Sequence, residues 1–300
     1  MSSDHSATSS KIAIGLVGAR GFIGSHLLKD LGKPNIYLKA FTREDSVLDK
    51  NNELNSEIKK LDVLVWAASG VNPSSAEIDH IKKDHELEYW RIFLKELSIK
   101  APDLRIIYLS SGGCTYSGND SAFCENSTAN GTNAYGQMKI QIETMLLEQN
   151  LTHQILRLSN VYGPGQRIGM GQGVIAEWID SAIKENALRV YGSLESYRDY
   201  IFIDDVVSAV KEVALRELKG NIYNVGSGKP LTLKNLYSIL SNFFAESLSI
   251  IEMPHRNFDR LGYVLNIDKI MDETNWKQQV DINTGVEQTL KHELINRGKK

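Results

Sequence analysis

The fold of this chain can be recognised from residues Ile12–Gly32, "IAIGLVGARGFIGSHLLKDLG". An apolar run leads into three glycines at three-residue intervals, Gly18, Gly21 and Gly24, and a helical pattern covers 22–31. A strand, a glycine turn and a helix in this order form the context that a dinucleotide-binding fingerprint requires. The alternative is a plain strand-to-helix turn without a bound phosphate.

Each glycine has a separate task if a dinucleotide binds here. Gly18 allows the sharp turn, Gly21 lets the backbone approach a pyrophosphate, and Gly24 lets the helix pack closely on the sheet. The helix N-terminus offers free N–H groups and partial positive charge to the phosphates. Further candidate cofactor contacts are Phe22, Ile23 and Ala67.

Composition places the chain among ordinary soluble proteins. Its 300 residues are 42% hydrophobic and 24% charged, enough for one large domain or two modest ones. A net charge of −3 argues against a nucleic-acid partner. No apolar run approaches the roughly 18 residues of a membrane span, and "MSSDHSATSS" lacks the apolar core of a signal peptide. Two cysteines make no disulfide framework and the histidines show no metal-ligand spacing, so we expect a cytoplasmic protein without a metal.

Apolar runs alternate with helical patterns through the first half of the chain. Strands are predicted at 11–17, 35–41, 62–69, 104–111 and 153–163, and helices at 22–31, 85–100 and 133–150. This alternation predicts an α/β fold, a doubly wound parallel sheet covered on both faces. The pattern loosens after about Tyr162. We therefore expect a disordered tail at 1–10, a Rossmann domain at 11–162 and a smaller C-terminal α/β lobe at 163–300, with some chain returning to the first domain.

Two residues with complementary chemistry share one predicted helix. Tyr135 and Lys139 in "AYGQMK" are four residues apart, hence on one face. Hydride transfer at a sugar carbon needs a group that gives or takes the hydroxyl proton. A free tyrosine has a pKa of about 10. A neighbouring lysine cation and an oxidised nicotinamide would lower it, so we expect Lys139 to activate Tyr135 and to hold the nicotinamide ribose.

Together, "GARGFIGSHL" and this Tyr-x-x-x-Lys pair resemble the extended short-chain dehydrogenase/reductase family, which contains nucleotide-sugar epimerases, dehydratases and ketoreductases. The resemblance extends over nearly the whole chain. It implies a nicotinamide cofactor, a nucleotide-sugar substrate and a possible homodimer formed through the helices around 85–100 and 135–149.

The chain departs from the family pattern at the end of the fourth strand. The family places a Ser or Thr there, four residues before a tyrosine. In "LSSGGCTYSG" the residue four before Tyr116 is Gly112. Ser111 is the nearest replacement and Thr115 the second, and a third possibility is that neither hydroxyl takes the role. The glycines would let the backbone shift so that Ser111 reaches the substrate.

The residue beyond the second strand bears on the choice of dinucleotide. A carboxylate there would bind the ribose hydroxyls, whereas an arginine accommodates a 2′-phosphate. The sequence "AFTRED" puts Arg43 at this place, followed by Glu44 and Asp45. Arg43 favours NADP, while NAD remains possible if Arg43 is a solvated turn residue. The segment from Glu44 to Leu61 is short for the fold, so one strand is expected to be missing or rudimentary.

The resemblance also implies a binding site for the substrate diphosphate. "RLSNVYGPGQ" gives Asn160, "YRDYIFIDDV" gives Arg198, and the segment beginning "MPHRNFDR" gives Arg256 and Asp259. Forked guanidinium groups match phosphate oxygens well, although each arginine could instead form a surface ion pair. Adjacent carboxylates, Asp204 and Asp205, would point to opposite faces of an extended segment and are interpreted as helix-capping and structural. Trp178 is interpreted as a packing residue.

Reduction of a 4-keto-6-deoxy sugar on dTDP or UDP by NADPH, with Tyr135 as proton donor, is the leading hypothesis. A 4-epimerase with retained NAD is the alternative, because it needs the same Tyr and Lys. A dehydratase is less favoured, since Gly112 and Gly113 stand where an Asp–Glu pair would help. A non-catalytic NADP-binding regulator is a rival from another class, and intact Tyr135 and Lys139 argue against it.

Overall fold

The computed structural model describes residues 11–118, 120–169, 172–218, 220–244, 247–254 and 262–298. Its strands are β1 (Ile12–Val17), β2 (Ile36–Phe41), β3 (Val63–Trp66), β4 (Arg105–Ser111), β5 (His153–Leu158), β6 (Asn160–Tyr162), β7 (Leu188–Tyr191), β8 (Tyr197–Phe202), β9 (Ile222–Val225), β10 (Pro230–Thr232) and β11 (Ile250–Met253). Its helices are α1 (Phe22–Leu31), α2 (Pro73–Ile78), α3 (His80–Lys100), α4 (Gly112–Thr115), α5 (Ala134–Leu147), α6 (Val174–Ile183), α7 (Ile203–Ala214), α8 (Leu233–Ser241), α9 (Asp268–Glu273), α10 (Ile282–Gly298) and the 3-10 turn η1 (Ser56–Lys60). Among these helices, none has the length and apolar content to cross a bilayer.

A six-stranded parallel sheet confirms the expected fold class. Its strand order is β2-β1-β3-β4-β5-β9, and every neighbouring pair is parallel. The chain adds β2 on one side of β1 and β3 on the other, so the winding direction reverses there. Open α/β sheets bind ligands at such a switch point, beyond the carboxyl ends of the strands.

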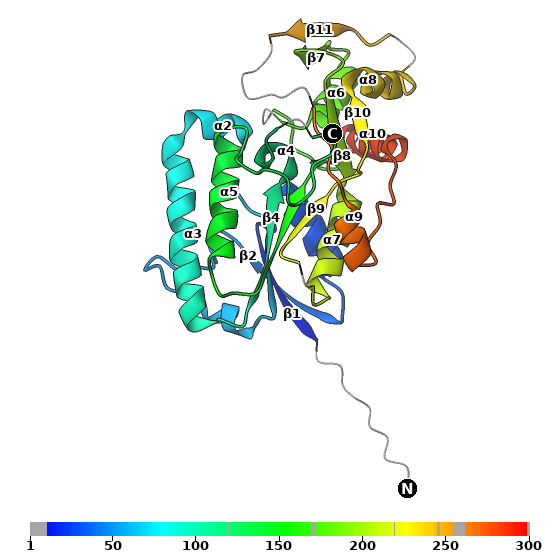
Figure 1. Cartoon of the computed structure of the whole chain (residues 1–300). Helices are drawn as coiled ribbons and strands as arrows, with labels where there is room; N and C mark the ends of the chain where they lie inside the picture. Colours follow the sequence, from blue (N-terminus) through cyan, green and yellow to red (C-terminus); the bar gives the residue numbers. More distant parts are fainter. Residues whose placement is uncertain are drawn as a thin grey trace.

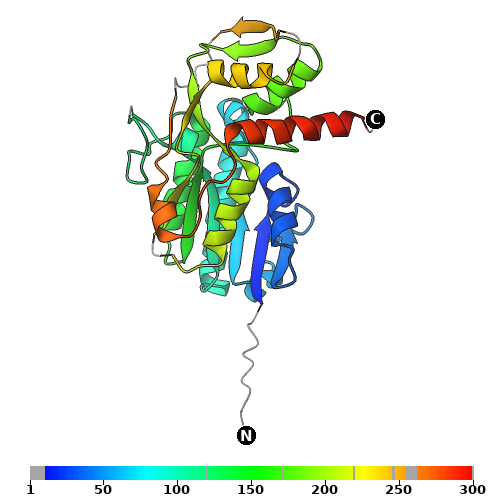
Figure 2. The same cartoon turned by 90° about the vertical axis from the view of Figure 1, so that its right-hand side faces the viewer.

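Helices cover both faces of this sheet (Figure 1). The helices α3 and α5 pack on one face and α1 and α7 on the other, each over its own buried cluster. The 90° view looks onto the face that α1 and α7 cover (Figure 2). The buried residues of α3 are all apolar: Leu87, Trp90, Phe93, Leu94 and Leu97.

The short segment after β2 adds no strand to the sheet. Residues 44–61 contain an isolated bridge between Leu48 and Leu54 and the turn η1, and β2 forms the edge of the sheet. As expected, this segment therefore contributes no strand to the large sheet.

One predicted strand is in fact two, which corrects the expectation for 153–163. β5 is buried along its whole length between β4 and β9. After Ser159 the chain leaves that sheet, and β6 joins β8 and β10 in a separate three-stranded sheet. The sequence gives no sign of this change of partner, because only Ser159 separates the two strands.

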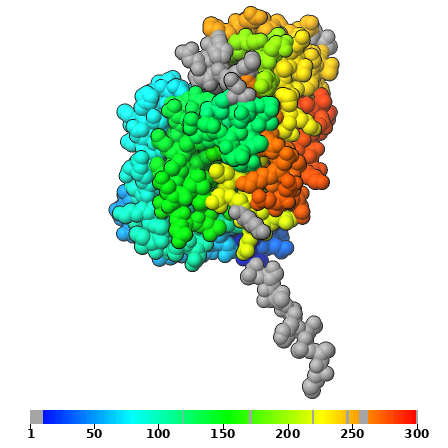
Figure 3. Space-filling view, in the orientation of Figure 1, coloured from blue at the N-terminus to red at the C-terminus, as the bar shows by residue number. Residues whose placement is uncertain are grey.

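The C-terminal half supplies both a lobe and part of the large sheet. The lobe contains β7 paired with β11, together with α6, α8 and α10 around a third buried cluster. β9 and α7 return to the first sheet. In the space-filling view, yellow and orange residues from this half lie beside the green residues of the first half (Figure 3).

Candidate active site

Close backbone contacts explain the glycines after β1. Gly18 has a φ of +89°, and a Cβ there would lie 2.9 Å from the Ala67 backbone at the end of β3. A Cβ on Gly24 would lie 2.0 Å from the Gly18 carbonyl oxygen. Glycine is thus required at the turn and where α1 packs on the strand. Ala67 lies at the switch point, because its N–H donates to the Val17 carbonyl at 2.9 Å.

The N-terminus of α1 fits an anionic group. Gly21 is the N-cap residue and offers no side-chain acceptor, and the first turn of this helix carries no acidic residue. Its first N–H groups and the positive end of the helix dipole therefore face the switch point without a built-in anion. Phe22 and Ile23 line the large cavity described below. These features suit the pyrophosphate of a dinucleotide.

Charged pairs surround Arg43, which is exposed beyond β2. Glu44 pairs with Arg20 at 3.3 Å, and Asp45 pairs with Lys39 at 2.7 Å. Both acids that follow Arg43 are thus held by other cations. Sequence reasoning missed Arg20, although a basic residue directly before Gly21 is a signal that could have drawn attention to it.

Tyr135 and Lys139 lie on α5 beside the end of β4. The Lys139 side chain is buried, with its Nζ 5.5 Å from the Tyr135 ring centroid and 4.7 Å from that of Tyr108. Its Nζ also donates to the Leu109 carbonyl at 3.3 Å. The cap that starts α5 is Asn133, whose side chain accepts from the Gly136 N–H at 2.8 Å. This cap places Tyr135 in the first turn of α5, near the carboxyl end of β4.

Burial dominates the electrostatics of this pair in the protein alone. Burial raises the pKa of the Tyr135 hydroxyl, with further increases from Cys114 and Glu86. Burial also lowers the pKa of Lys139, against the opposing effect of Glu86. The lysine cation therefore does not lower the tyrosine pKa in the protein alone, because desolvation disfavours the phenolate more strongly. Tyr135 carries its proton at neutral pH.

Ser111 lines the cavity at the strand end, and Thr115 does not. Thr115 is fully buried, and its Oγ1 donates to the Ser111 carbonyl at 2.6 Å within α4. The structure thus brings Ser111, and not Thr115, into the same cavity as Tyr135. Leu265 occupies the space beside Gly112, where a Cβ would lie 2.6 Å from its Cδ1.

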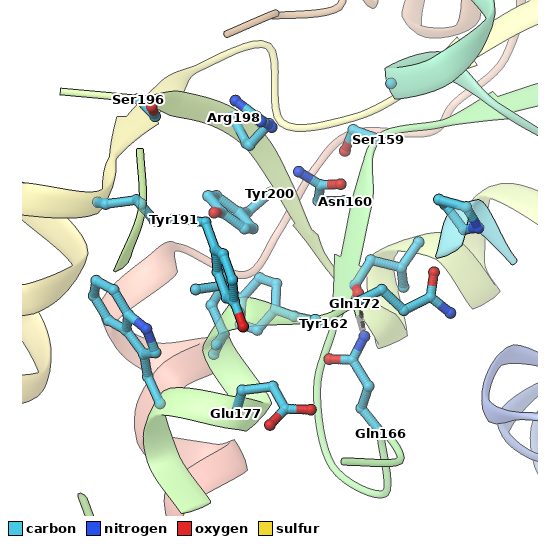
Figure 4. Close-up of a pocket in the computed structure, with 18 of the residues that line it drawn as sticks. Ser159, Asn160, Tyr162, Gln166, Gln172, Glu177, Tyr191, Ser196, Arg198 and Tyr200 are labelled. Carbon is cyan, nitrogen blue, oxygen red and sulfur yellow. Dashed lines mark hydrogen bonds between the residues drawn. The ribbon is translucent and has the colours of Figure 1, made fainter. Parts of the chain in front are cut away.

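A cavity of about 1020 Å³ lies between the strand ends and the C-terminal lobe. Asn160 on β6 and Arg198 on β8 lie at one end of it, Glu177 on α6 lies at the other, and Tyr191 lies between them (Figure 4). The Arg198 Nη1 donates to the Tyr197 carbonyl at 2.8 Å. The cavity is large enough for a nucleotide-linked sugar.

The remaining candidate residues are accounted for as follows. Arg256 and Asp259 lie outside the described residues. Trp178 is buried in the cavity wall and donates from its Nε1 to the Arg189 carbonyl at 3.0 Å, as a packing residue does. Asp204 and Asp205 lie in the first turn of α7, at the helix N-terminus. Asp205 is structural, because it accepts the backbone N–H groups of Gln279 and Val280.

The buried Asp199 carboxylate holds two loop segments in place through hydrogen bonds. The sequence analysis did not identify this residue. Asp199 is fully buried and accepts hydrogen bonds from Ser227 N and Oγ, Gly228 N and Leu265 N, at 2.7 to 3.2 Å. Burial raises the pKa of Asp199, although these hydrogen bonds act in the opposite direction. Its position directly after Arg198, a predicted site residue, could have drawn attention to Asp199.

A second buried polar group supports the catalytic helix from behind. Glu143 lies one turn beyond Lys139, and both its carboxylate oxygens accept hydrogen bonds from Arg157 on β5. The shortest of these distances is 2.6 Å, and the two side chains are 2% and 4% exposed. Ser110, next to Ser111, donates to Glu143 at 2.5 Å. The pair thus ties α5 to the ends of β4 and β5.

Comparison with known proteins places this geometry in a family. The model of the NAD dependent epimerase/dehydratase family matches residues 14–226. A dTDP-4-dehydro-6-deoxyglucose reductase of Escherichia coli is 30% identical over 92% of this chain and 96% of that protein. A putative UDP-glucose 4-epimerase of Methanocaldococcus jannaschii is 25% identical over the same shares of the two chains.

Solved structures of similar proteins share the fold. A UDP-glucose 4-epimerase of Thermotoga maritima with UDP-glucose superimposes with a TM-score of 0.82 at 21% identity, covering 95% of this chain and 100% of that one. A Thermus thermophilus UDP-glucose 4-epimerase in complex with NAD gives a TM-score of 0.81 at 22% identity, covering 94% and 98%. These likenesses concern the architecture of both the sheet domain and the lobe.

Proposed function

Because this chain belongs to the NAD dependent epimerase/dehydratase family, we propose that it reduces the 4-keto group of a nucleotide-linked 6-deoxy sugar with NADPH. The observation that carries the proposal is the position of Tyr135 in the wall of the cavity, with the Lys139 Nζ beside its ring. Reduction of a ketone requires a proton donor, whereas oxidation of a hydroxyl requires a base. The E. coli reductase, 30% identical, supports the same direction of reaction.

The roles of the residues follow from their positions. The dinucleotide, when bound, supplies the hydride. Tyr135 donates its hydroxyl proton to the oxygen of the reacting carbon. The Lys139 ammonium group lies beside the Tyr135 ring and reaches the ribose of the cofactor. Ser111, at the end of β4, binds the same substrate oxygen as Tyr135. Asn160 and Arg198 bind the substrate diphosphate within the same cavity.

Ser111→Ala is expected to reduce turnover more than Thr115→Ala. Ser111 lines the cavity, whereas the Thr115 hydroxyl is already bound to a backbone carbonyl. Loss of one hydrogen bond to a reacting oxygen costs about tenfold or more in kcat. Both variants should be assayed side by side with the same keto sugar, with thermal unfolding as the control for stability. A larger loss for Thr115→Ala would transfer the role to Thr115.

Arg43→Ala is expected to weaken NADPH binding about ten- to a hundredfold and to change NADH binding little. A charge-assisted hydrogen bond contributes roughly 1.5–3 kcal/mol, and tenfold in affinity corresponds to about 1.4 kcal/mol. The acids beside Arg43 are paired with Arg20 and Lys39, so they leave Arg43 available to a 2′-phosphate. Fluorescence titration of both cofactors against wild type and variant measures the effect. Equal loss for NADH and NADPH would show that Arg43 does not read the phosphate.

A 4-epimerase with retained NAD is the second candidate. It is supported by the M. jannaschii relative and by Glu44 beyond β2, since a carboxylate there can bind ribose hydroxyls. Mass spectrometry of the copurified cofactor, with a screen of UDP-, dTDP- and GDP-linked 4-keto sugars, separates the two. Release of NADP and consumption of NADPH with a keto sugar support the reductase. Tightly held NAD and interconversion of UDP-hexoses without net NADPH use would support the epimerase.

A further inference from the structure

A carboxylate on α3 holds the loop that follows β3. The Glu86 side chain accepts hydrogen bonds from the Ser69 hydroxyl at 2.9 Å and from the Gly70 N–H at 2.7 Å. This loop begins at Ala67, the candidate cofactor contact at the switch point. It also lies near the end of β4, because the last residue of β3 pairs with Tyr108. Glu86 therefore supports one wall of the proposed cofactor site.

The same part of the structure contains a buried cation. Lys139 is 2% exposed, and its Nζ lies 4.7 Å from the Tyr108 ring centroid and donates to the Leu109 carbonyl on β4. A carbonyl dipole and aromatic rings stabilise an ammonium group only in part, so a buried lysine also needs an opposite charge nearby. Because α3 and α5 lie side by side on this face of the sheet (Figure 1), a carboxylate on α3 can supply it.

Acidic groups on three elements favour the charged form of Lys139. Burial lowers the pKa of Lys139. The groups that act in the opposite direction are, in order of size, Glu86 on α3, Glu143 on α5 and Cys114 on α4. Glu143 is already neutralised, because both its oxygens pair with Arg157. The hydrogen bonds to Glu86 come from neutral donors, so its negative charge is left to act on Lys139.

Two tyrosines and a carboxylate on α2 do not supply this charge. Burial raises the pKa of Tyr108 on β4 and of Tyr135 on α5, so both face Lys139 as neutral phenols. Glu77 on α2 accepts a hydrogen bond from the first backbone N–H of α5 at 2.7 Å, and so balances the N-terminus of that helix instead. Among the described residues, Glu86 is thus the carboxylate that remains to balance Lys139.

We propose that Glu86 is a positioning residue of this active site, whose carboxylate fixes the loop after β3 and is the counter-ion that keeps Lys139 charged. When Tyr135 gives its proton to the substrate, a phenolate remains beside the Lys139 Nζ. An ammonium group stabilises that phenolate, whereas a neutral amine does not. Glu86 thus acts on the proton transfer through Lys139 and does not touch the substrate. This consequence for catalysis rests on the proposed oxidoreduction of a sugar.

Urea unfolding at neutral pH tests the counter-ion without any substrate. Glu86→Gln removes the charge but keeps an amide oxygen that can accept from the Gly70 N–H. We expect it to lower the urea midpoint of the wild type, and to lower that of Lys139→Met by at most about a third as much, because methionine leaves no cation to balance. Glu88→Gln, on the exposed side of α3, is the matched control and should have the same small effect in both backgrounds. Equal losses from Glu86→Gln in both backgrounds would overturn the counter-ion role.

The pH dependence of turnover tests the consequence for catalysis. Without the Glu86 charge, Lys139 loses its proton at a lower pH, because burial then acts against less opposition. Burial, Cys114 and Glu86 raise the pKa of Tyr135 in that order, so removal of Glu86 moves the Tyr135 titration in the same direction. We therefore expect Glu86→Gln to shift the alkaline limb of kcat to lower pH. On that limb kcat should fall about three- to tenfold more than at neutral pH, and Glu88→Gln should leave the profile unchanged.

Glu86→Ala separates the hold on the loop from the charge. Alanine removes the acceptor of the Gly70 N–H as well as the charge, so it should weaken NADPH binding in addition to shifting the alkaline limb. Glu86→Gln should leave Kd for NADPH at neutral pH within about threefold of the wild-type value. A loss of kcat in Glu86→Gln that is the same at every pH would mean that Glu86 only holds the loop, and would overturn the counter-ion role.

The outcomes distinguish this inference from the proposed function. Turnover of a keto sugar by the wild type, together with an alkaline limb that Glu86→Gln does not shift, would overturn the inference and leave the function standing. Absence of turnover by the wild type with every keto sugar and hexose of the screen would overturn the proposed function. The unfolding comparison would still decide in that case whether Glu86 balances Lys139.

Discussion

Tyr135→Phe is expected to lower kcat about 10²–10⁴-fold, the usual contribution of a single general acid. Phenylalanine keeps the ring in its half-buried position but has no proton to donate. Lys139 lies near the ring and binds the Leu109 carbonyl, so its position does not depend on the Tyr135 hydroxyl. Single-turnover kinetics with a keto sugar and saturating NADPH measure the loss directly.

NADPH binding provides the control for this variant. The glycine turn and α1 are independent of Tyr135, so Kd for NADPH should stay within a few-fold of the wild-type value. A variant that binds NADPH normally and retains near-normal turnover would mean that another group delivers the proton. The mechanism proposed for Tyr135 would then be wrong, whatever the substrate.

Arg157→Ala is expected to reduce the free energy of unfolding by about 3–5 kcal/mol, because it leaves the Glu143 carboxylate buried without a cation. Whole domains of this kind unfold with about 5–15 kcal/mol, so the loss is a large part of the total. Both partners are nearly inaccessible to solvent, and water cannot compensate. Equilibrium urea unfolding, with the slope compared between variants, measures the change.

An exposed ion pair supplies the matched control. Arg91 pairs with Glu88 on the surface of α3 at 3.1 Å, with both side chains more than half exposed. Arg91→Ala should cost less than about 1 kcal/mol. The double variant Glu143→Gln/Arg157→Met should recover much of the loss, since it removes both charges together. If Arg157→Ala costs no more than Arg91→Ala, the buried pair does not hold α5 to the sheet.

The parts that were predictable from sequence depend on local spacing. Gly18 and Gly24 follow from backbone geometry within seven residues, and the structure shows the close contacts that require them. Leu87 and Trp90 on α3 follow from helical periodicity. The Tyr135–Lys139 pair follows from a separation of four residues on one helix. In each case the sequence pattern lies within one element or one turn, although Gly18 also contacts Ala67 at the end of β3.

The parts that were missed depend on contacts between distant segments. Tyr263 meets Gly113 across 150 residues, and Asp199 meets Leu265 across 66. No pattern along the chain encodes these encounters. The effect of burial on the Tyr135 pKa could not be predicted for a related reason. Its sign depends on how much protein covers the phenol, and that follows from the assembled fold rather than from the adjacent lysine.

The interleaved path of the chain limits how this architecture can be recombined. β9 completes the large sheet beside β5, although it follows α6, β7 and β8 of the lobe in the chain. A chimera with a single junction after Tyr162 would take β9 and α7, as well as the lobe, from the homologue. Its β5 would then pair with a β9 from a different protein. Exchange of the lobe between homologues therefore needs several crossovers at once. Substitution of individual cavity residues is the less disruptive route to a new sugar specificity in this enzyme.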